Sequence, residues 1–212
     1  EGEMPETGCC TASDSEDARK VASKLDIPYY VLDYTESFSK NVVDNFIDMY
    51  AQGLTPNPCV ECNRSVKFDH FLNQAKKLNC EKVATGHYAK IIKNENFYEL
   101  HKADYLDKDQ SYVLHMLKSD DLENILFPLG EITKPEVRQI AARLGLKTAF
   151  KKDSQDICFV GKKDYRSFVE KRIDLTSPGE IFDVNGNKVG DHKGIHEFTV
   201  GQRKGLPGGQ AT

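Results

Sequence analysis

NRSVKFDHFLNQAKKLNCEKVATGHY, residues 63–88, contains the clearest helix-to-strand transition in the chain. Apolar side chains recur at helical spacing in its first part, which predicts a helix over about residues 63–78. The apolar stretch 82–88 predicts a short buried strand that ends at Gly86. A helix that leads directly into a buried strand is typical of α/β folds with a parallel sheet.

The same alternation precedes this stretch. An amphipathic helix capped by Asp14 or Ser15 is expected first. Residues 29–35 then predict a short buried strand, and residues 38–51 predict a second helix that ends at Gly53. Helices and strands in this order strengthen the assignment to the α/β class.

Further elements are expected after residue 88, in chain order: a hairpin that turns at residues 94–96, helices over 110–117 and 120–126, and a helix over 133–145. Thr133 and Glu136 form a capping box at the start of the last helix, and Gly145 ends it.

The sequence changes character near Gly161. Beyond it, one helix precedes an alternating β-ribbon in which Asn185-Gly186 supplies the hairpin turn. We therefore expect two domains: an α/β domain over residues 1–161 and a small α+β domain over residues 162–212.

Composition limits the class of protein. A chain of 212 residues is long enough to bury a substantial core. No apolar run approaches the length of a membrane span, and no segment is typical of a signal peptide. The six cysteines are too few and too unevenly placed for a disulfide framework. We expect a cytoplasmic protein with reduced cysteines and no membrane contact.

The formal net charge of −4 argues against a protein coated in basic residues, but it permits a local basic patch. Three basic pairs are candidates for such a patch: Lys151-Lys152, Lys162-Lys163 and Arg203-Lys204. Taken singly, each pair is more typical of a solvated surface.

Cys59 and Cys62 are separated by two residues in TPNPCVECNRSVKF, residues 55–68. Four interpretations are open: half of a zinc site, a redox pair, two buried thiols, or a reactive thiol. Zinc would need a second ligand pair at a recognised spacing, which the chain lacks, so we expect no metal site. A redox pair would be expected at the start of a helix that follows a strand, whereas Cys59 and Cys62 lie between two expected helices. Asn63 is a good N-cap, which would place Cys62 just before the first helical turn, where a thiolate is favoured.

Two other cysteines differ in setting. Cys158 lies in the polar loop DSQDICFVGKK, where two lysines follow it and favour a thiolate. Cys80 is more typical of packing or of an ordinary surface position.

Six blocks in chain order resemble the successive motifs of the tRNA-specific 2-thiouridylases, the MnmA/TrmU family: TPNPCVECNRSVKF, ATGHYA, KDQSYVL, FPLGEITKPEVR, DSQDICFVG and GQRKGL. The resemblance implies an adenine-nucleotide hydrolase-like α/β domain of the PP-loop ATP pyrophosphatase type, followed by a small central domain. Neither the PP-loop nor the C-terminal β-barrel of the family is present in the sequence. We therefore expect an internal fragment.

The resemblance also implies a reaction. Family members convert the wobble uridine of the lysine, glutamate and glutamine tRNAs to 2-thiouridine. ATP, with Mg²⁺, adenylates the C2 oxygen, and a cysteine persulfide then delivers sulfur. The implied partners are tRNA and a persulfide sulfur donor protein.

Site residues follow from the same resemblance, position by position. Cys158 would carry the persulfide, and Cys62 would be its catalytic partner, leaving a Cys62–Cys158 disulfide to be reduced. Gly86 would contact the nucleotide at the carboxyl end of its strand. The positions that resemble tRNA contacts are Asn57, Pro58, Cys59, His87, Lys108, Asp109 and Gln110. The family often has Asp where this chain has Cys59, so an acid–base role is not carried over to Cys59.

Two alternatives remain open. Cys59, Cys62 and Cys158 could ligate an iron–sulfur cluster with one iron left open for sulfide. The chain could also be a tRNA-binding module without catalysis, since it lacks the phosphate loop.

Overall fold

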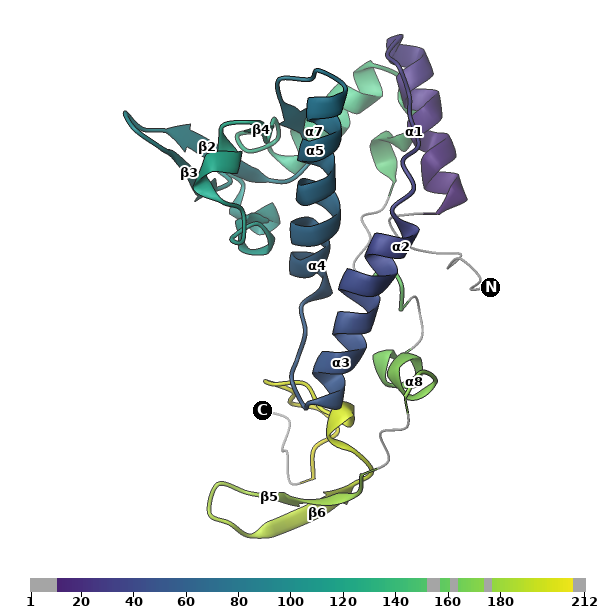
Figure 1. The fold of residues 1–212 in the computed structure, drawn as a ribbon, viewed down its shortest axis with the longest axis vertical. Coiled ribbons are helices and arrows are strands. Elements are labelled where there is room, and N and C mark those ends of the chain that lie inside the picture. The colour runs from purple at the N-terminus through teal and green to yellow at the C-terminus, as the bar shows by residue number, and fades with distance from the viewer. Residues whose placement is uncertain (1–10, 152–156, 161–163, 174–176, 208–212) are drawn as a thin grey trace.

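The computed structural model describes residues 11–151, 157–160, 164–173 and 177–207. In these residues, long helices stand beside three small two-stranded sheets, and the β-hairpin nearest the C-terminus lies at one end of the molecule (Figure 1). None of the described helices is both long enough and apolar enough to span a bilayer.

Helix α1 (Ala12–Leu25) begins one turn earlier than expected. The Thr11 side chain accepts a hydrogen bond from the Asp14 amide at 3.1 Å, and the Asp14 carboxylate accepts from the Thr11 amide at 3.2 Å. Asp14 is therefore the third helical residue of a capping box, and the prediction of Asp14 or Ser15 as the N-cap was wrong. Lys151 also bonds Asp14, and this contact, more than any other, lowers the pKa of that carboxyl to about 2.

The predicted strand over residues 29–35 is absent. The chain there is irregular, and Tyr30 and Val31 are 70% and 71% exposed. A strand requires a neighbour to complete its backbone hydrogen bonds. No described strand pairs with these residues, so apolar composition alone does not make them a strand.

A continuous helix follows, made of α2 (Thr35–Phe38), the π-helical turn η1 (Ser39–Asp44) and α3 (Asn45–Ala51). This confirms the helix predicted over 38–51, with an additional first turn. Gly53, at φ +72°, ends it. The side chains it buries are Val42, Phe46, Ile47 and Tyr50.

The next long helix consists of α4 (Pro58–Glu61), the π-helical turn η2 (Cys62–Phe68) and α5 (Asp69–Lys77). It therefore begins five residues before the expected start at Asn63. Beyond it, β1 (Val83–Ala84) pairs in parallel with β4 (Ile125–Leu126). The parallel strands and the surrounding helices confirm the α/β class.

The segment around β4 corrects two helix predictions. Residues 110–117 form only a single 3₁₀ turn, Ser111–Val113, and residues 120–126 divide into α6 (Ser119–Leu122) and β4. Ile125 is 1% exposed and pairs with the buried Val83. Burial beside β1 therefore outweighs the helical preference of the segment.

The predicted hairpin is confirmed as β2 (Ala89–Lys93) and β3 (Tyr98–Lys102). It packs against the long helix through one apolar cluster: Phe68, Ala89, Val113, Leu114, Ile125 and Phe127. Helix α7 (Lys134–Arg143) has the predicted Thr133–Glu136 capping box, and Gly145 follows it at φ +63°.

Gly130 lies directly against β2, and a methyl group there would sit 2.1 Å from the Ala89 carbonyl oxygen. We expect Gly130→Ala to lower the free energy of unfolding by about 2–3 kcal/mol, because a strand backbone in the core must move. The matched control is Gly86→Ala, whose new methyl would meet only Leu129, at 3.9 Å. It should change stability by less than about 0.5 kcal/mol in urea unfolding. Equal losses from the two variants would contradict the packing argument.

The C-terminal unit contains α8 (Tyr165–Glu170) and an antiparallel hairpin of β5 (Gly179–Phe182) and β6 (Lys188–His192). Both were predicted, and Gly186 in the turn has φ +84°. Gly161, the expected domain boundary, lies outside the described residues.

Candidate functional site

Asn57 caps the helix that carries the cysteine pair. Its side-chain oxygen accepts hydrogen bonds from the amides of Cys59 and Val60 at 3.2 and 3.3 Å. Pro58, which is buried, occupies the first helical position, where a missing amide hydrogen has no cost. An Asn-Pro sequence is a helix-start pattern, so this cap was visible in the sequence and was missed.

Asn63 is not a cap. It is 2% exposed, and its side-chain amide donates to the Val113 carbonyl at 3.1 Å. This buried bond ties the second turn of the helix to the 3₁₀ turn at residues 111–113. Asn63 therefore holds the helix start against the core, a role that the sequence reasoning missed.

The corrected helix start changes the setting of the cysteines. Cys59 lies in the first turn and is exposed, whereas Cys62 lies one turn further on and is half-buried. The field of a helix terminus falls off within its first turn, so it favours a thiolate at Cys59 more than at Cys62. Our argument for Cys62 from its distance to the helix start was wrong.

Cys158 occupies a turn anchored by apolar neighbours. Ile157, Phe159 and Val160 pack on the cluster formed by α3 and α8. The Phe159 ring meets Phe46 edge-on at a centroid distance of 5.2 Å, so the turn is held on both sides of the cysteine. The two lysines expected to favour its thiolate, Lys162 and Lys163, lie outside the described residues.

The two predicted catalytic cysteines border the same piece of helix. Cys62 opens η2, which packs against η1. Phe159, next to Cys158, contacts Phe38 and Phe46, which flank η1 at its two ends. The helix α2–α3 is therefore their common support.

Among the residues that the structure describes, no three His, Cys, Asp or Glu side chains gather closely enough to hold a metal ion. The iron–sulfur alternative, which needs three cysteine thiolates at one site, stays a prediction.

A second group of predicted residues gathers where β1 ends. Gly86 is exposed there, at the carboxyl end of the parallel pair. The side-chain oxygen of Gln110 accepts from the Tyr88 amide at 3.0 Å, and the Gln110 amide donates to the Tyr88 carbonyl at 2.8 Å. Gln110 thus fixes the backbone directly after Gly86 and His87.

Asp109 has a local structural role. One carboxylate oxygen accepts from the Ala103 amide at 2.8 Å, and the other accepts from the Ser111 hydroxyl at 2.7 Å. Lys108 precedes it in a 3₁₀ turn, Leu106–Lys108. The stretch 108–110 therefore folds as a braced loop beside the end of β1.

His87 is a neutral side chain in this setting. Burial, and to a smaller extent the nearby Lys67 charge, lowers its pKa to about 4. Its ring lies near Phe68 and Phe127, and its Nδ1 shares a 2.8 Å hydrogen bond with the Thr85 hydroxyl. A neutral imidazole can hydrogen-bond a base or a ribose, but it brings no positive charge to a phosphate.

The His87 shift predicts a pH dependence. The unfolded chain binds a proton below about pH 6.5, whereas the folded chain resists it down to about pH 4, so folding weakens as the pH falls through this window. We expect the free energy of unfolding to fall by about 1–2 kcal/mol more between about pH 7 and 5 in the wild type than in His87→Gln. Urea unfolding at both pH values measures it. Parallel losses in the two proteins would show that His87 does not titrate with folding.

The fold and the site define a class: an α/β domain whose strand ends face a braced loop, followed by a small unit built on a hairpin. Comparison with known proteins agrees. A family described as "tRNA methyl transferase HUP domain" matches residues 2–162, and one described as "tRNA methyl transferase PRC-barrel domain" matches residues 166–211. The first part is therefore adenine-nucleotide hydrolase-like, and the second is a small central domain.

Curated relatives give the family a narrower name. Proteins named "tRNA-specific 2-thiouridylase MnmA" are similar over most of the chain: 49% identical over 199 residues in Rickettsia peacockii (strain Rustic), 47% over 207 in Clostridium perfringens (strain 13 / Type A), and 52% over 201 in Renibacterium salmoninarum. The alignments cover 93%, 97% and 94% of this chain, but only 54%, 58% and 53% of the relatives. The chain thus spans about half the length of the curated relatives it matches. It belongs to the MnmA/TrmU family.

Proposed function

We propose that the protein catalyses ATP-dependent 2-thiolation of the wobble uridine in the lysine, glutamate and glutamine tRNAs. The observation that carries the proposal is that the helix start with Asn57, Pro58 and Cys59 and the turn with Cys158 share one supporting helix. Family membership and the names of the relatives support the same kind of reaction.

The sulfur step needs two thiols. A persulfide on Cys158, loaded by a donor protein, attacks C2 of the uridine, and the activated C2 oxygen departs. This leaves the uridine joined to Cys158 through a disulfide. The Cys62 thiolate then attacks the Cys158 sulfur and releases 2-thiouridine, with the electrons supplied by the two cysteines. An external thiol then reduces the resulting Cys62–Cys158 disulfide and restores the two cysteines.

ATP, when bound with Mg²⁺, supplies the adenylyl group that makes the C2 oxygen a leaving group. Gly86 fits a place beside the bound nucleotide. It is exposed where β1 ends, and no contact among the described residues requires a glycine at this position. The absent side chain leaves room for a ligand to approach the backbone, as at other open α/β sheets.

The tRNA contacts are assigned by chemistry. Asn57 and Pro58 fix the start of the helix on which Cys59 is exposed, so the base would be held beside the thiols. His87 would hydrogen-bond as a neutral ring, and Lys108 would face the phosphate backbone. Gln110 and Asp109 would act by holding this loop in shape. We place the reaction in the cytoplasm, where thiols stay reduced.

The test is mass spectrometry of nucleosides from unmodified tRNA incubated with the protein expressed from its whole gene, ATP and a persulfide donor. We expect 2-thiouridine only when all three components are present. Binding of tRNA without any 2-thiouridine would favour the non-catalytic tRNA-binding module instead.

A further inference from the structure

The last described loop of the chain contacts the loop that leads to α4. The helix formed by α4, η2 and α5 carries Cys59 and Cys62 and is called the cysteine helix. The Val200 amide donates to the Thr55 hydroxyl at 3.0 Å. Ile195 packs on Gly53 so closely that a methyl group there would lie 2.9 Å from its Cδ1 atom. Figure 1 shows residues 194–207 against the C-terminal end of α3. The C-terminal unit is thus packed against the loop that leads to the proposed site.

Aromatic contacts add to this packing between the C-terminal unit and α3. The Tyr165 ring stacks on Tyr50 at a centroid distance of 4.6 Å, and the Thr199 hydroxyl donates to the Tyr165 hydroxyl oxygen at 3.2 Å. Tyr50 is 4% exposed and belongs to the core of α3. The loop is therefore fixed to a helix that also supports the Cys158 turn.

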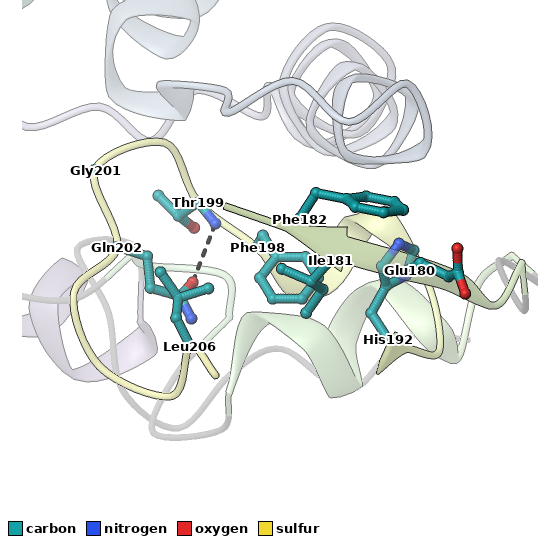
Figure 2. A pocket seen from close by; sticks show the side chains of 9 residues that line it. All are labelled: Glu180, Ile181, Phe182, His192, Phe198, Thr199, Gly201, Gln202 and Leu206. Carbon is teal, nitrogen blue, oxygen red and sulfur yellow. Dashed lines mark hydrogen bonds between the residues drawn. The ribbon is translucent and has the colours of Figure 1, made fainter. Parts of the chain in front are cut away.

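Gln202 sets the shape of the loop. Its side-chain oxygen accepts from the Thr199 amide at 3.1 Å (Figure 2), and its side-chain nitrogen donates to the Lys204 carbonyl at 2.9 Å. Gly201 and Gly205 have φ of +85° and +77°, which allow the two sharp bends on either side. Residues of this loop and of the hairpin β5–β6 together line a pocket of about 400 Å³.

Arg203 and Lys204 lie at the tip of this braced loop, and both are exposed. Within the described residues, neither has an ion pair with an acidic side chain, whereas Lys151 and Lys188 each pair with two carboxylates. In a chain with a net charge of −4, two unpaired cations on a fixed loop form a local anion-binding surface.

The position of this pair identifies its ligand. Thr55 is four residues from Cys59, so the docking point lies within about 14 Å of the cysteine along the chain. A polyanion that reaches the docking point at Thr55 can therefore also reach Cys59. We propose that Arg203 and Lys204 bind phosphate groups of the tRNA anticodon arm while its wobble uridine occupies the site at the start of the cysteine helix, and that Gln202 is their positioning residue. This proposal rests on the proposed function and adds an interaction surface to it.

The test compares two charge-matched double variants in the protein expressed from its whole gene. Arg203→Gln/Lys204→Gln removes the proposed surface. Lys76→Gln/Lys77→Gln makes the same charge change in the last turn of α5, at the far end of that helix from α4 (Figure 1). The probe is an unmodified tRNA transcript with a wobble uridine, and the measurement is Kd across about 50–200 mM salt.

We expect the loop variant to weaken binding by about tenfold and to reduce the slope of log K against log salt by about 1.4, as for two lost phosphate contacts to a single strand. The α5 variant should leave both unchanged. Gln202→Ala keeps both cations, so it should weaken binding with little change in slope, a pattern that simple loss of charge would not give. Equal effects of the two double variants, or unchanged binding by the loop variant, would overturn the proposal.

Binding of tRNA and formation of 2-thiouridine are measured separately, so that failure of the interaction surface can be distinguished from failure of the proposed function. The interaction surface is judged by the Kd of the loop variant for tRNA, and the proposed function is judged by 2-thiouridine formation by the wild type. If the wild type binds tRNA in this loop-dependent way but forms no 2-thiouridine, the proposed function fails and the interaction surface stands. If the wild type thiolates tRNA and the loop variant binds normally, only the surface is wrong.

Discussion

Cys158→Ser is expected to abolish 2-thiouridine formation while leaving tRNA affinity within about twofold of wild type. A serine hydroxyl cannot carry a sulfane sulfur, so the loss should be about 10³-fold or more. The fold should tolerate the change, because Ile157, Phe159 and Val160 anchor the turn on the cluster formed by α3 and α8. Nucleoside mass spectrometry measures the product, and filter binding measures affinity.

The control for this variant is its own persulfide content. After incubation with a sulfur donor, the wild type should gain the mass of one sulfur atom on the peptide that contains Cys158, and the variant should not. Continued 2-thiouridine production by Cys158→Ser would remove Cys158 from the sulfur-transfer step.

Cys62→Ala should block turnover to a similar extent, about 10³-fold, but at a later step. Without the second thiol, nothing resolves the disulfide between Cys158 and the uridine sulfur. We therefore expect a protein–tRNA conjugate that is visible on a non-reducing gel and is released by an added thiol. Cys158→Ser should give no such conjugate.

Cys80→Ala is the matched control for Cys62→Ala. Cys80 is exposed beyond the end of α5, and its sulfur lies 3.9 Å from the Leu78 carbonyl. Its replacement should leave turnover near wild type. Equal losses from the Cys62 and Cys80 variants would indicate a general loss of stability and would refute a chemical role for Cys62.

The parts of the fold that depend on local chemistry were predictable. The Thr133–Glu136 capping box, Gly145 at positive φ and the Asn185-Gly186 turn are each determined by a few adjacent residues. The strand pairings were less accessible. Residues 29–35 lack a described partner strand and stay irregular, whereas residues 125–126 become a strand because β1 lies beside them. Both outcomes depend on contacts distant in sequence.

The candidate site shows the same division. The motifs identified the cysteines and the loop at residues 108–110, but not the contacts that position them. The Asn57 cap was available from the Asn-Pro pattern, whereas the bond from Asn63 to Val113 joins residues 50 positions apart and has no local sign. The contact of Val200 with Thr55 spans 145 positions, so the link between the two units required a structure.

The π-helical turn η2 accommodates one extra residue in the helix that carries the cysteine pair. Each residue turns an α-helix by about 100°, and a π-helical turn takes up about one residue more than an α-helical turn, so the extra residue leaves the two flanking parts of the helix in nearly the same phase. Deleting one residue such as Ser65 would let the helix become regular while Cys59 and Cys62 keep nearly the same direction relative to the buried Phe68. A relative with an identical Cys-x-x-Cys motif and one residue fewer before Phe68 would therefore still direct its thiols toward the same neighbours.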